Sequence, residues 1–265
     1  MPANIHPAEN SSDGPIERSR QGAWAVPVEH LHVNAIPRDA INLNVEGRHL
    51  TGPIRGFGQL WQKTYRTRLS GAKVAPEHVV RVWKDNFPSF WPKGNQFYGS
   101  AGGIAPGEVA LLNLAGPGGI TAPGGGPLIS TGIMVIYADE ESFSFMTPDG
   151  HMFAGMITFS AFEEDGETVA QTQVLVRAND PIYEMSFRLG FGHSAEDHFW
   201  AQTLENLATH FGVNGVVKQA VICVDPKVQW SQAKNIWHNA AVRTGIYIML
   251  APIRWVRGVF IRKNA

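Results

Sequence analysis

The chain has 265 residues, and its 22 Lys and Arg nearly balance 23 Asp and Glu, so the net charge is −1. This balance gives no overall attraction to nucleic acid, which we therefore do not expect as a partner. A chain of this length with 44% hydrophobic residues can bury a sizeable core. The single cysteine, Cys223, excludes an intramolecular disulfide and a cysteine-based zinc cluster, and we expect it to be a buried thiol.

The first part of the chain is polar and irregular. Residues 1–22 lack the basic start and apolar run of a secretory signal, which favours a disordered arm on a cytoplasmic protein. Residues 23–57 have scattered apolar groups between prolines and glycines, with no sustained period. We expect this second segment to be an extended lead-in to the folded domain.

The first regular pattern, over residues 58–69, has a period of two, which is typical of a β-strand. One side carries Trp61, Tyr65, Thr67 and Leu69. The other side carries Gln62, Thr64, Arg66 and Arg68. Lys63 shares the apolar side, where it is either a strand-end residue or a charge aimed into a cavity.

A helix is predicted to begin at Pro76, because proline suits the first helical position. The residues with helical spacing are Val79, Val82, Trp83, Asn86, Phe87 and Phe90. Pro88 and Pro92 indicate where this helix ends.

Four apolar runs follow, over residues 128–138, 142–146, 155–162 and 168–177. Short turns rich in Asp and Gly separate them, which predicts an antiparallel meander. In the last strand we expect Ala170, Thr172, Val174 and Val176 to face the interior. The other side carries Gln171, Gln173 and Arg177, and Arg66, Arg68 and Arg177 are expected to be solvated charges.

Two helices are predicted after the meander. Asp180 and Pro181 form a cap and first-position signature for a helix that reaches about residue 189. Residues 194–197 then resemble a capping box in which Asp197 replaces the usual Glu or Gln. The apolar face of the second helix carries Trp200, Leu204, Leu207 and Phe211, and Gly212 ends it. Such an amphipathic helix needs a sheet to lie on.

Residues 213–265 form a separate extension in which residues 233–243 have helical character and residues 244–260 are distinctly apolar. A membrane-spanning helix needs about 20 apolar residues, whereas Pro252, Arg254 and Arg257 interrupt this tract. Residues 244–260 therefore either pack on the domain or a partner protein, or contact a membrane surface with Trp255 at the headgroup level.

With these elements placed, the chain resembles the START-like, helix-grip superfamily called SRPBCC. The resemblance rests on residues 74–85, VAPEHVVRVWKD, and on residues 87–91, FPSFW. Residues 147–155, TPDGHMFAG, with Phe159, are similar to a G-H-x(3)-G-x(3)-F stretch of an uncharacterised bacterial branch. The resemblance implies an α+β fold over residues 58–212, with an antiparallel sheet wrapped around a long C-terminal helix and an internal cavity. Members hold lipids or other hydrophobic small molecules there, and some catalyse cyclisation or dehydration.

Polar candidates for a site are few. His151 follows a turn, where it is either a proton donor or anchor at a cavity mouth, or a histidine bonded to local backbone. His193 and His198 fall on different helical faces, which argues against a shared metal. His30 and His32 have no third ligand in an obvious pattern, so we expect no metal, and no cofactor is indicated.

The glycine-rich tract at residues 116–127 leads into a strand rather than a helix, which argues against a phosphate-binding loop. It is either a flap over a cavity or an ordinary long loop.

Three hypotheses for function follow. The first is a non-catalytic binding or carrier domain for a hydrophobic small molecule or lipid. Its expected ligand-binding residues are Trp61, Tyr65, Trp83, Phe87, Phe90, Phe145, His151, Phe159 and Trp200. The second is a cyclase- or dehydratase-like enzyme with His151 and Tyr65 as acid and base groups. The third is an accessory assembly protein whose two ends wrap a partner.

Overall fold

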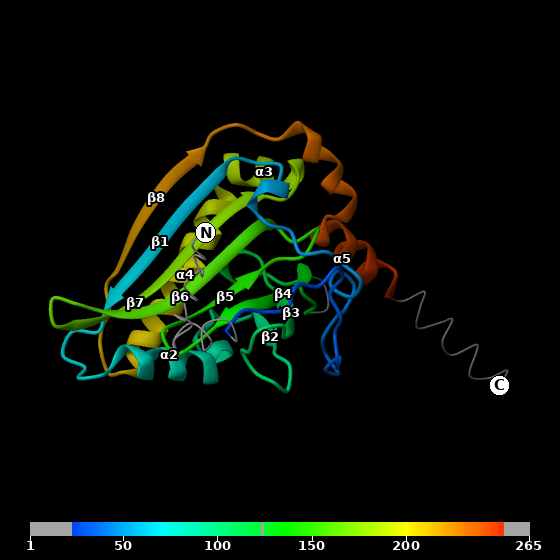
Figure 1. Ribbon diagram of the computed structural model, residues 1–265. Coiled ribbons are helices and arrows are strands. Elements are labelled where there is room, and N and C mark those ends of the chain that lie inside the picture. Colours follow the sequence, from blue (N-terminus) through cyan, green and yellow to red (C-terminus); the bar gives the residue numbers. More distant parts are fainter. Residues whose placement is uncertain (1–22, 123–124, 252–265) are drawn as a thin grey trace, which may run out of the picture.

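Eight strands form one antiparallel sheet in the order β2-β3-β4-β5-β6-β7-β1-β8 (Figure 1). The computed structural model describes residues 23–122 and 125–251. The strands are β1 (Leu60–Arg68), β2 (Gln96–Tyr98), β3 (Val109–Leu114), β4 (Ile129–Ala138), β5 (Ser142–Met146), β6 (Phe153–Glu164), β7 (Glu167–Ala178) and β8 (Val217–Asp225). The α-helices are α2 (Pro76–Asp85), α3 (Pro181–Arg188), α4 (Phe191–His210) and α5 (Ala240–Met249). The 3-10 helices are η1 (Pro53–Arg55), η2 (Phe87–Phe90), η3 (Pro117–Gly119) and η4 (Trp230–His238).

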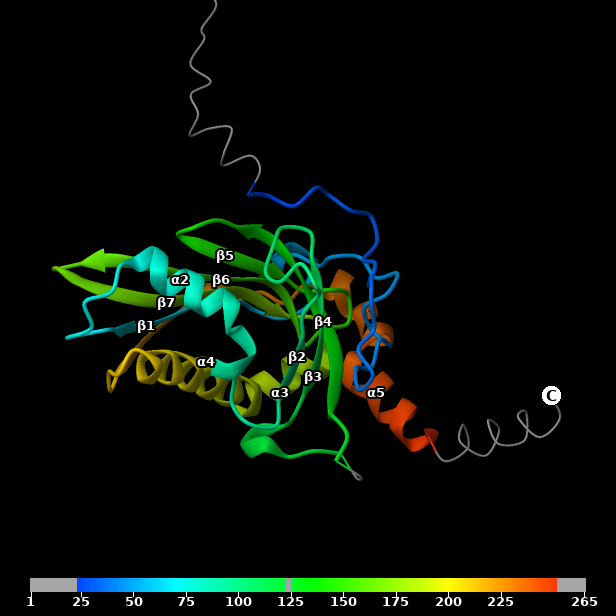
Figure 2. The same ribbon diagram turned by 90° about the horizontal axis from the view of Figure 1, so that it is seen from below.

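Strands β4 to β7 form the predicted antiparallel meander, and β1 then pairs with β7, so that the first strand closes onto the last strand of the meander. Helix α4 lies against β1 and α2 lies against β6, and both helices cover the same side of the sheet (Figure 2). A long helix held against a curved antiparallel sheet is the helix-grip arrangement. The α+β helix-grip prediction is confirmed by this topology.

The main core lies between this side of the sheet and the two helices. Its buried aromatic residues are Tyr65, Trp83, Phe87, Phe90, Trp91, Phe143, Phe145 and Phe159. The alternation along β1 buries Lys63, Tyr65 and Thr67 on the same inner side, as the period-two pattern predicted for the apolar face. Helix α4 adds Leu204 and Leu207 from its second half.

The lead-in, residues 23–57, packs on the outer side of the sheet. Leu31, Val33 and Val45 form a second core with Leu111 of β3 and Met134 of β4. Isolated bridges tie the lead-in to β4 and to the loop after β5, at Trp24–Tyr137 and Leu50–Pro148. In Figure 2 the blue lead-in runs past β4 on the side away from α4. The lead-in is therefore extended but makes many contacts with its own domain.

The chain returns to the sheet after α4, which the sequence did not predict. β8 pairs antiparallel with β1, so the predicted domain boundary at residue 212 falls before a strand of the same sheet. Cys223 lies on β8 and is exposed, which corrects the expectation of a buried thiol. Strands β2 and β3, inside the glycine- and proline-rich tract, were also not predicted.

Arg177 corrects a second expectation. It lies on the outer face, as its strand parity predicted, but its side chain is buried rather than solvated. Its guanidinium donates hydrogen bonds to the carbonyls of Gly58 and Lys227 and pairs with Asp225 at the end of β8. The chain segment after β8 therefore covers this charge.

Two helix boundaries differ from the prediction. α2 ends at Asp85, and a separate 3-10 turn, η2, carries Phe87 and Phe90, because Pro88 cannot continue an α-helix. α4 begins at Phe191 rather than near residue 194, since its N-cap Gly190 has a φ of 83° and ends the preceding turn. Asp180 caps α3 as predicted, accepting hydrogen bonds from the backbone of Ile182 and Tyr183.

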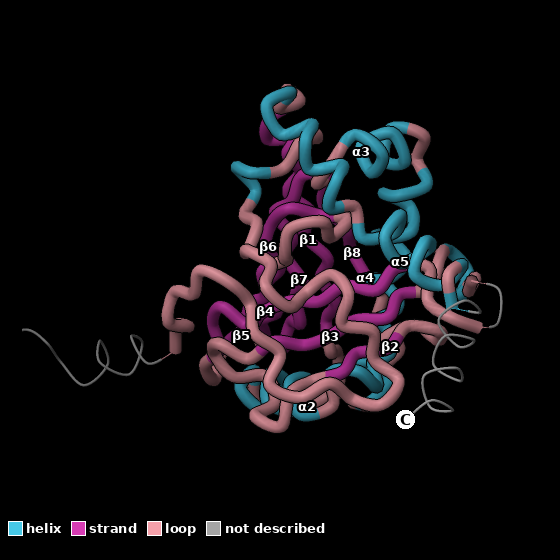
Figure 3. Tube along the Cα trace, turned by 90° about the vertical axis from the view of Figure 1, so that its right-hand side faces the viewer, coloured by secondary structure: helices cyan, strands magenta, loops and turns pink. Residues whose placement is uncertain are grey.

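The C-terminal part of the described chain packs on one end of the molecule. α5 contacts β4, where Thr244 Oγ1 accepts a hydrogen bond from the backbone N–H of Ser130. Figure 3 shows the strands between α2 at one end and α3 at the other. Within the described residues, every helix is too short or too polar to cross a membrane. The predicted arm at residues 1–22 and the residues from 252 onward lie outside the described part of the chain.

Candidate functional site

The most unusual feature of the interior is a charged cluster that we call the α4 network, comprising Lys63, Tyr65, Glu196 and Asp197. The Lys63 ammonium lies 2.8 Å from a Glu196 carboxylate oxygen and 2.7 Å from an Asp197 carboxylate oxygen. The Tyr65 hydroxyl donates a hydrogen bond of 2.7 Å to the same Asp197 oxygen. The side chains of Lys63 and Glu196 are only 1% and 2% exposed. Ionic groups are seldom buried to this degree unless they are paired.

Local geometry explains how the α4 network forms. Strand parity turns Lys63 and Tyr65 toward α4, which settles the alternative left open for Lys63 in favour of an inward charge. The early start of α4 places Glu196 and Asp197 in its second turn, facing β1, instead of in a capping box at the helix N-terminus. Gly192 lets α3 and α4 approach, because a Cβ at this position would lie 1.7 Å from the Phe187 ring.

The two carboxyl groups have pKa values shifted in opposite directions. Burial raises the pKa of Glu196 to about 6, and the attraction of Lys63 only partly offsets this. Burial also opposes ionisation of Asp197, but hydrogen bonds from Lys63, Tyr65 and Gln219 outweigh it and hold the pKa below its usual value. Paired carboxyl groups in unequal environments are typical of sites that bind or transfer protons. Burial thus raises the pKa of Glu196, while hydrogen bonding lowers the pKa of its neighbour Asp197.

An open hollow of about 380 Å³, which we call the Trp61 hollow, adjoins this network. It is lined by Gln59, Trp61, Glu184, Phe187, Arg188 and His193. The His193 ring lies 5.0 Å from the Trp61 ring and 5.1 Å from the Phe187 ring, so the three rings form an aromatic wall. Trp61 lies two residues before Lys63 on β1, and His193 lies three residues before Glu196 on α4, so this wall lies beside the network. Burial and the nearby Lys63 charge lower the pKa of His193.

Some polar atoms at the hollow have hydrogen-bond partners and others have none. Glu184 is buried and its carboxylate accepts a hydrogen bond of 2.8 Å from Arg188, which is half exposed. His193 Nδ1 is buried and has no hydrogen-bond partner among the described residues. Buried polar atoms without a partner are uncommon in folded proteins. The hollow thus combines the aromatic side chains of Trp61 and Phe187 with the polar side chains of Gln59, Glu184, Arg188 and His193.

The opposite end of the interior is filled. Phe159 stacks on Phe143 at 4.8 Å between ring centroids and meets Trp83 edge-on at 5.2 Å. Phe87 contacts Phe145 at 5.3 Å and Phe159 at 5.1 Å. Packed rings therefore occupy the space, within the described residues, where the sequence predicted a ligand cavity. Among the proposed ligand-binding residues, those in this packed cluster are Trp83, Phe87, Phe90, Phe145 and Phe159.

The remaining proposed residues are spread over both ends. Trp200 is partly buried and contacts the Phe159 ring at 5.4 Å, at the border of the packed cluster. Tyr65 belongs to the network, where burial and the neighbouring carboxylates of Glu196 and Asp197 raise its pKa. Trp61 is the proposed residue that lines the open hollow.

The structure does not bring His151 and Tyr65 together. His151 is buried in the turn before β6, and its Nδ1 accepts a hydrogen bond of 3.0 Å from the backbone N–H of Phe153. Phe153 lies opposite Ala178, whereas Tyr65 lies opposite Thr172, six residues away along β7. This separation corresponds to about 20 Å. Burial lowers the pKa of His151 to about 4, so the ring is neutral near pH 7.

The other histidines singled out by the sequence have local partners or are exposed. The His30 ring lies 4.3 Å from the His49 ring, tilted by 39°, and His32 lies 2.9 Å from a Glu46 carboxylate oxygen. His198 lies on the exposed side of α4. In the described ranges, no group of three potential ligands is arranged to hold a metal ion.

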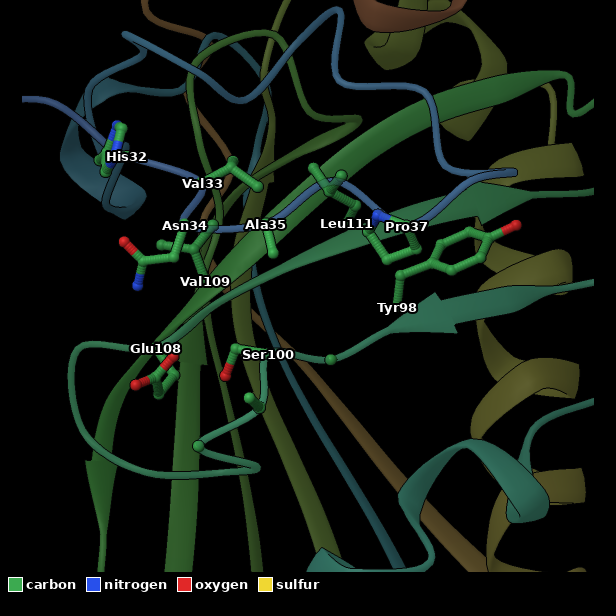
Figure 4. A pocket seen from close by; sticks show the side chains of 13 residues that line it. His32, Val33, Asn34, Ala35, Pro37, Tyr98, Ser100, Glu108, Val109 and Leu111 are labelled. Carbon is green, nitrogen blue, oxygen red and sulfur yellow. The ribbon is translucent and has the colours of Figure 1, made fainter.

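A second hollow, of about 210 Å³, lies between the lead-in and the β2–β3 region. Figure 4 shows Tyr98 and Pro37 at one end of it and Ser100 and Glu108 at the other. Its volume is smaller than that of most ligand pockets, which begin near 300 Å³. Buried charged groups such as those beside Trp61 are not part of its lining in the described chain. We therefore take the Trp61 hollow as the candidate site.

Sequence reasoning missed most of this site. Glu196 was not singled out, and Asp197 was interpreted as the acidic residue of a capping box over residues 194–197. The only signal was Lys63, a charge on the apolar side of a strand. Its partners lie more than a hundred positions away in the sequence, so their meeting depends on how α4 docks.

Comparisons with known proteins complete the description. No family model matches the chain, and no curated protein matches it. A major latex-like protein from Panax ginseng is 14% identical over 58% of this chain and 99% of that chain, with a TM-score of 0.38. The di-domain ARO/CYC protein StfQ from the steffimycin biosynthetic pathway is 13% identical over 58% of this chain and 51% of that chain, with a TM-score of 0.40.

A protein from Thermus thermophilus is 14% identical over 57% of this chain and 96% of that chain, with a TM-score of 0.38. Values this low carry no conclusion about activity, and the fold assignment rests on the topology of this chain. Membership of the bacterial branch with the G-H-x(3)-G-x(3)-F stretch stays a prediction.

Proposed function

We propose that this chain is a non-catalytic binding protein for a small amphipathic molecule, such as a lipid with a single chain, which it holds in the Trp61 hollow. One observation carries the proposal: an open hollow with an aromatic wall lies beside the buried α4 network. The apolar part of the ligand contacts Trp61 and Phe187, and its polar part meets His193 and Arg188. This modifies the original carrier hypothesis, because the ligand sits at the open end and not among the packed rings.

The size of the hollow fits such a ligand. A volume of about 380 Å³ lies at the lower end of the range for ligand pockets. It accommodates a molecule of the size of dodecanoate and leaves a large sterol or polyketide partly outside. The half-exposed Arg188 guanidinium offers a partner for a hydroxyl or carboxyl group of the ligand.

Native mass spectrometry of the purified protein, followed by titration with dodecanoate, tests this proposal. We expect saturable binding at one site, and Trp61→Ala weakens it about tenfold or more, because a central aromatic contact is lost. Trp24→Ala is the matched control, since Trp24 is exposed and packs on Tyr137 away from the hollow. Absence of binding, or equal weakening by both substitutions, would contradict the proposal.

A second candidate function is contact with a membrane surface through α5, which begins the apolar tract predicted at residues 244–260. Val242, Ile246, Met249 and Leu250 are all exposed. Their spacing places them on one side of α5, while Ala240 and Thr244 face the domain. A stripe of this kind is typical of helices that lie in the interface of a bilayer.

Flotation with vesicles of phosphatidylcholine and phosphatidylserine tests this second candidate. We expect the protein to float with the vesicles and the double variant Ile246→Glu, Met249→Glu to stay behind. Val26→Glu serves as control, because Val26 is exposed in the lead-in. Flotation that survives the double substitution would show that α5 is not the contact.

A further inference from the structure

The two margins of the sheet differ greatly. β2 has three residues, and short edge strands protect a sheet against unwanted pairing. β8 has nine residues and forms the opposite margin, with only β1 beside it in the described chain (Figure 1). Its sequence, VKQAVICVD, contains no proline, and the residues between Lys218 and Asp225 carry no charge. Such a strand presents a row of unpaired backbone groups to another strand.

β8 is also unusually exposed on both faces. Val221, on the side that faces α4, is 46% exposed, and Ile222, on the outer side, is 57% exposed. Val224 and Cys223 are exposed as well. An exposed long edge strand rich in β-branched residues marks an interaction surface, since monomeric proteins seldom leave one uncovered.

We propose that β8 pairs antiparallel with β8 of a second copy of this chain, so that the two sheets become continuous. With a two-fold axis through Val221, each residue of β8 lies opposite a residue whose side chain points to the same face. The inner faces of the two sheets therefore join, and so do the outer faces. In this register Val221 lies opposite Val221 of the second copy. Ala220 then lies opposite Ile222, and Gln219 lies opposite Cys223.

Charge supports this partner and this register. β8 already has an irregularity after Cys223, where Asp225 pairs with Leu60 and Val224 is skipped. If Val224 is also passed over in the pairing between copies, Lys218 of one copy lies directly opposite Asp225 of the other on the outer face. The two-fold symmetry makes two such pairs. The only cation and the only anion of β8 thus become neighbours across the two-fold axis.

Within one copy, Lys218 has an unfavourable position. It lies directly opposite Arg66 of β1, and like charges in that relation destabilise a sheet. Among the described residues, Lys218 belongs to no ion pair. Pairing with Asp225 of a second copy gives this lysine an opposite charge. Residues 1–22 are a poorer occupant of the edge, because Pro2, Pro7 and Pro15 interrupt strand pairing.

Sedimentation velocity over a range of concentrations tests the proposal. We expect a dimer, with Lys218→Glu weakening it roughly tenfold or more, because two attractive charge pairs become repulsive. The same change places Glu beside Arg66, so it does not harm the fold of one copy. Ile36→Lys is the control, since Ile36 is exposed in the lead-in, which packs on β3 and β4, far from β8 in the strand order. A monomer at all concentrations, or a dimer insensitive to Lys218→Glu, would overturn the proposal.

Oxidative cross-linking tests the register itself. Val221→Cys combined with Cys223→Ser places two thiols directly opposite each other, within disulfide reach. The two native Cys223 side chains would instead be displaced by four residues, about 13 Å apart. We expect rapid cross-linking of the Val221→Cys variant and little of the unchanged protein. Equal cross-linking of the two would refute this register.

Discussion

The two ends of the space between the sheet and α4 are built from different chemistry. At one end, Trp83, Phe87 and Phe159 interlock as fully buried rings, and at the other Lys63, Glu196 and Asp197 form a buried ionic network beside an open hollow. Packed rings stabilise the fold through burial and dispersion. Buried ions cost desolvation free energy that a hydrophobic replacement would avoid. The contrast places a stabilising role at the packed end, and our proposal places ligand binding at the charged end.

We expect the largest effect from a substitution that removes an aromatic ring from the packed end. Phe159→Ala should lower the free energy of unfolding by about 4 kcal/mol, because Phe159 contacts several other rings and its loss leaves a cavity. Urea denaturation measures this change. Dodecanoate affinity of the folded variant should remain close to that of the unchanged protein. A small loss of stability together with a large loss of affinity would reverse the roles of the two ends.

A somewhat smaller effect is expected from Lys63→Met. Removal of this cation leaves Glu196 and Asp197 buried without their charge partner, which should cost about 3 kcal/mol of unfolding free energy. Protonation of Glu196 relieves part of the cost, so the loss should be smaller at pH 5 than at pH 8. The double variant Lys63→Met, Glu196→Leu should recover stability, and a loss larger than that of the single variant would contradict this account.

The smallest effect is a pH dependence due to Glu196. Its pKa in the folded state, about 6, exceeds its usual value of 4.5, so the folded protein binds this proton more tightly. This proton therefore adds about 2 kcal/mol to the free energy of unfolding below pH 4.5, and the contribution is lost as the pH rises through 6. His151 and His193 act in the opposite direction because burial lowers their pKa values.

Comparison of the unchanged protein with Glu196→Gln isolates the carboxyl group. Urea denaturation at each pH gives the free energy of unfolding of both proteins. Between pH 4.5 and 7, the value for the unchanged protein should fall by about 2 kcal/mol relative to that of the variant. Parallel curves for the two proteins would show that Glu196 titrates normally.

The sequence predicted the parts of the fold that local patterns determine. Strands β4 to β7 follow from alternating runs and Asp/Gly turns, and α3 follows from the cap at Asp180. β8 escaped prediction because its residues show no clean alternation: it is an edge strand that is exposed on both faces. The prediction that Cys223 is buried was wrong for the same reason, because Cys223 lies on this exposed edge strand.

The candidate site was less predictable than the fold. The spacing of the aromatic residues indicated that they face inward, but whether they line a cavity or fill it depends on packed volumes, which a one-dimensional pattern does not contain. The α4 network joins β1 to α4, and only docking of the helix brings Glu196 to Lys63. Trp61 was predicted to face inward from the strand pattern alone, and it lines the open hollow.

The most direct test of the difference between the two ends is an NMR titration with dodecanoate that follows the indole N–H signals of Trp61 and Trp83. Trp61 lines the open hollow, and Trp83 is fully buried among the packed rings. We predict that the Trp61 signal shifts progressively to saturation while the Trp83 signal stays in place. A shift of Trp83 with Trp61 unchanged, or no shift of either signal, would contradict the assignment of ligand binding to the charged end.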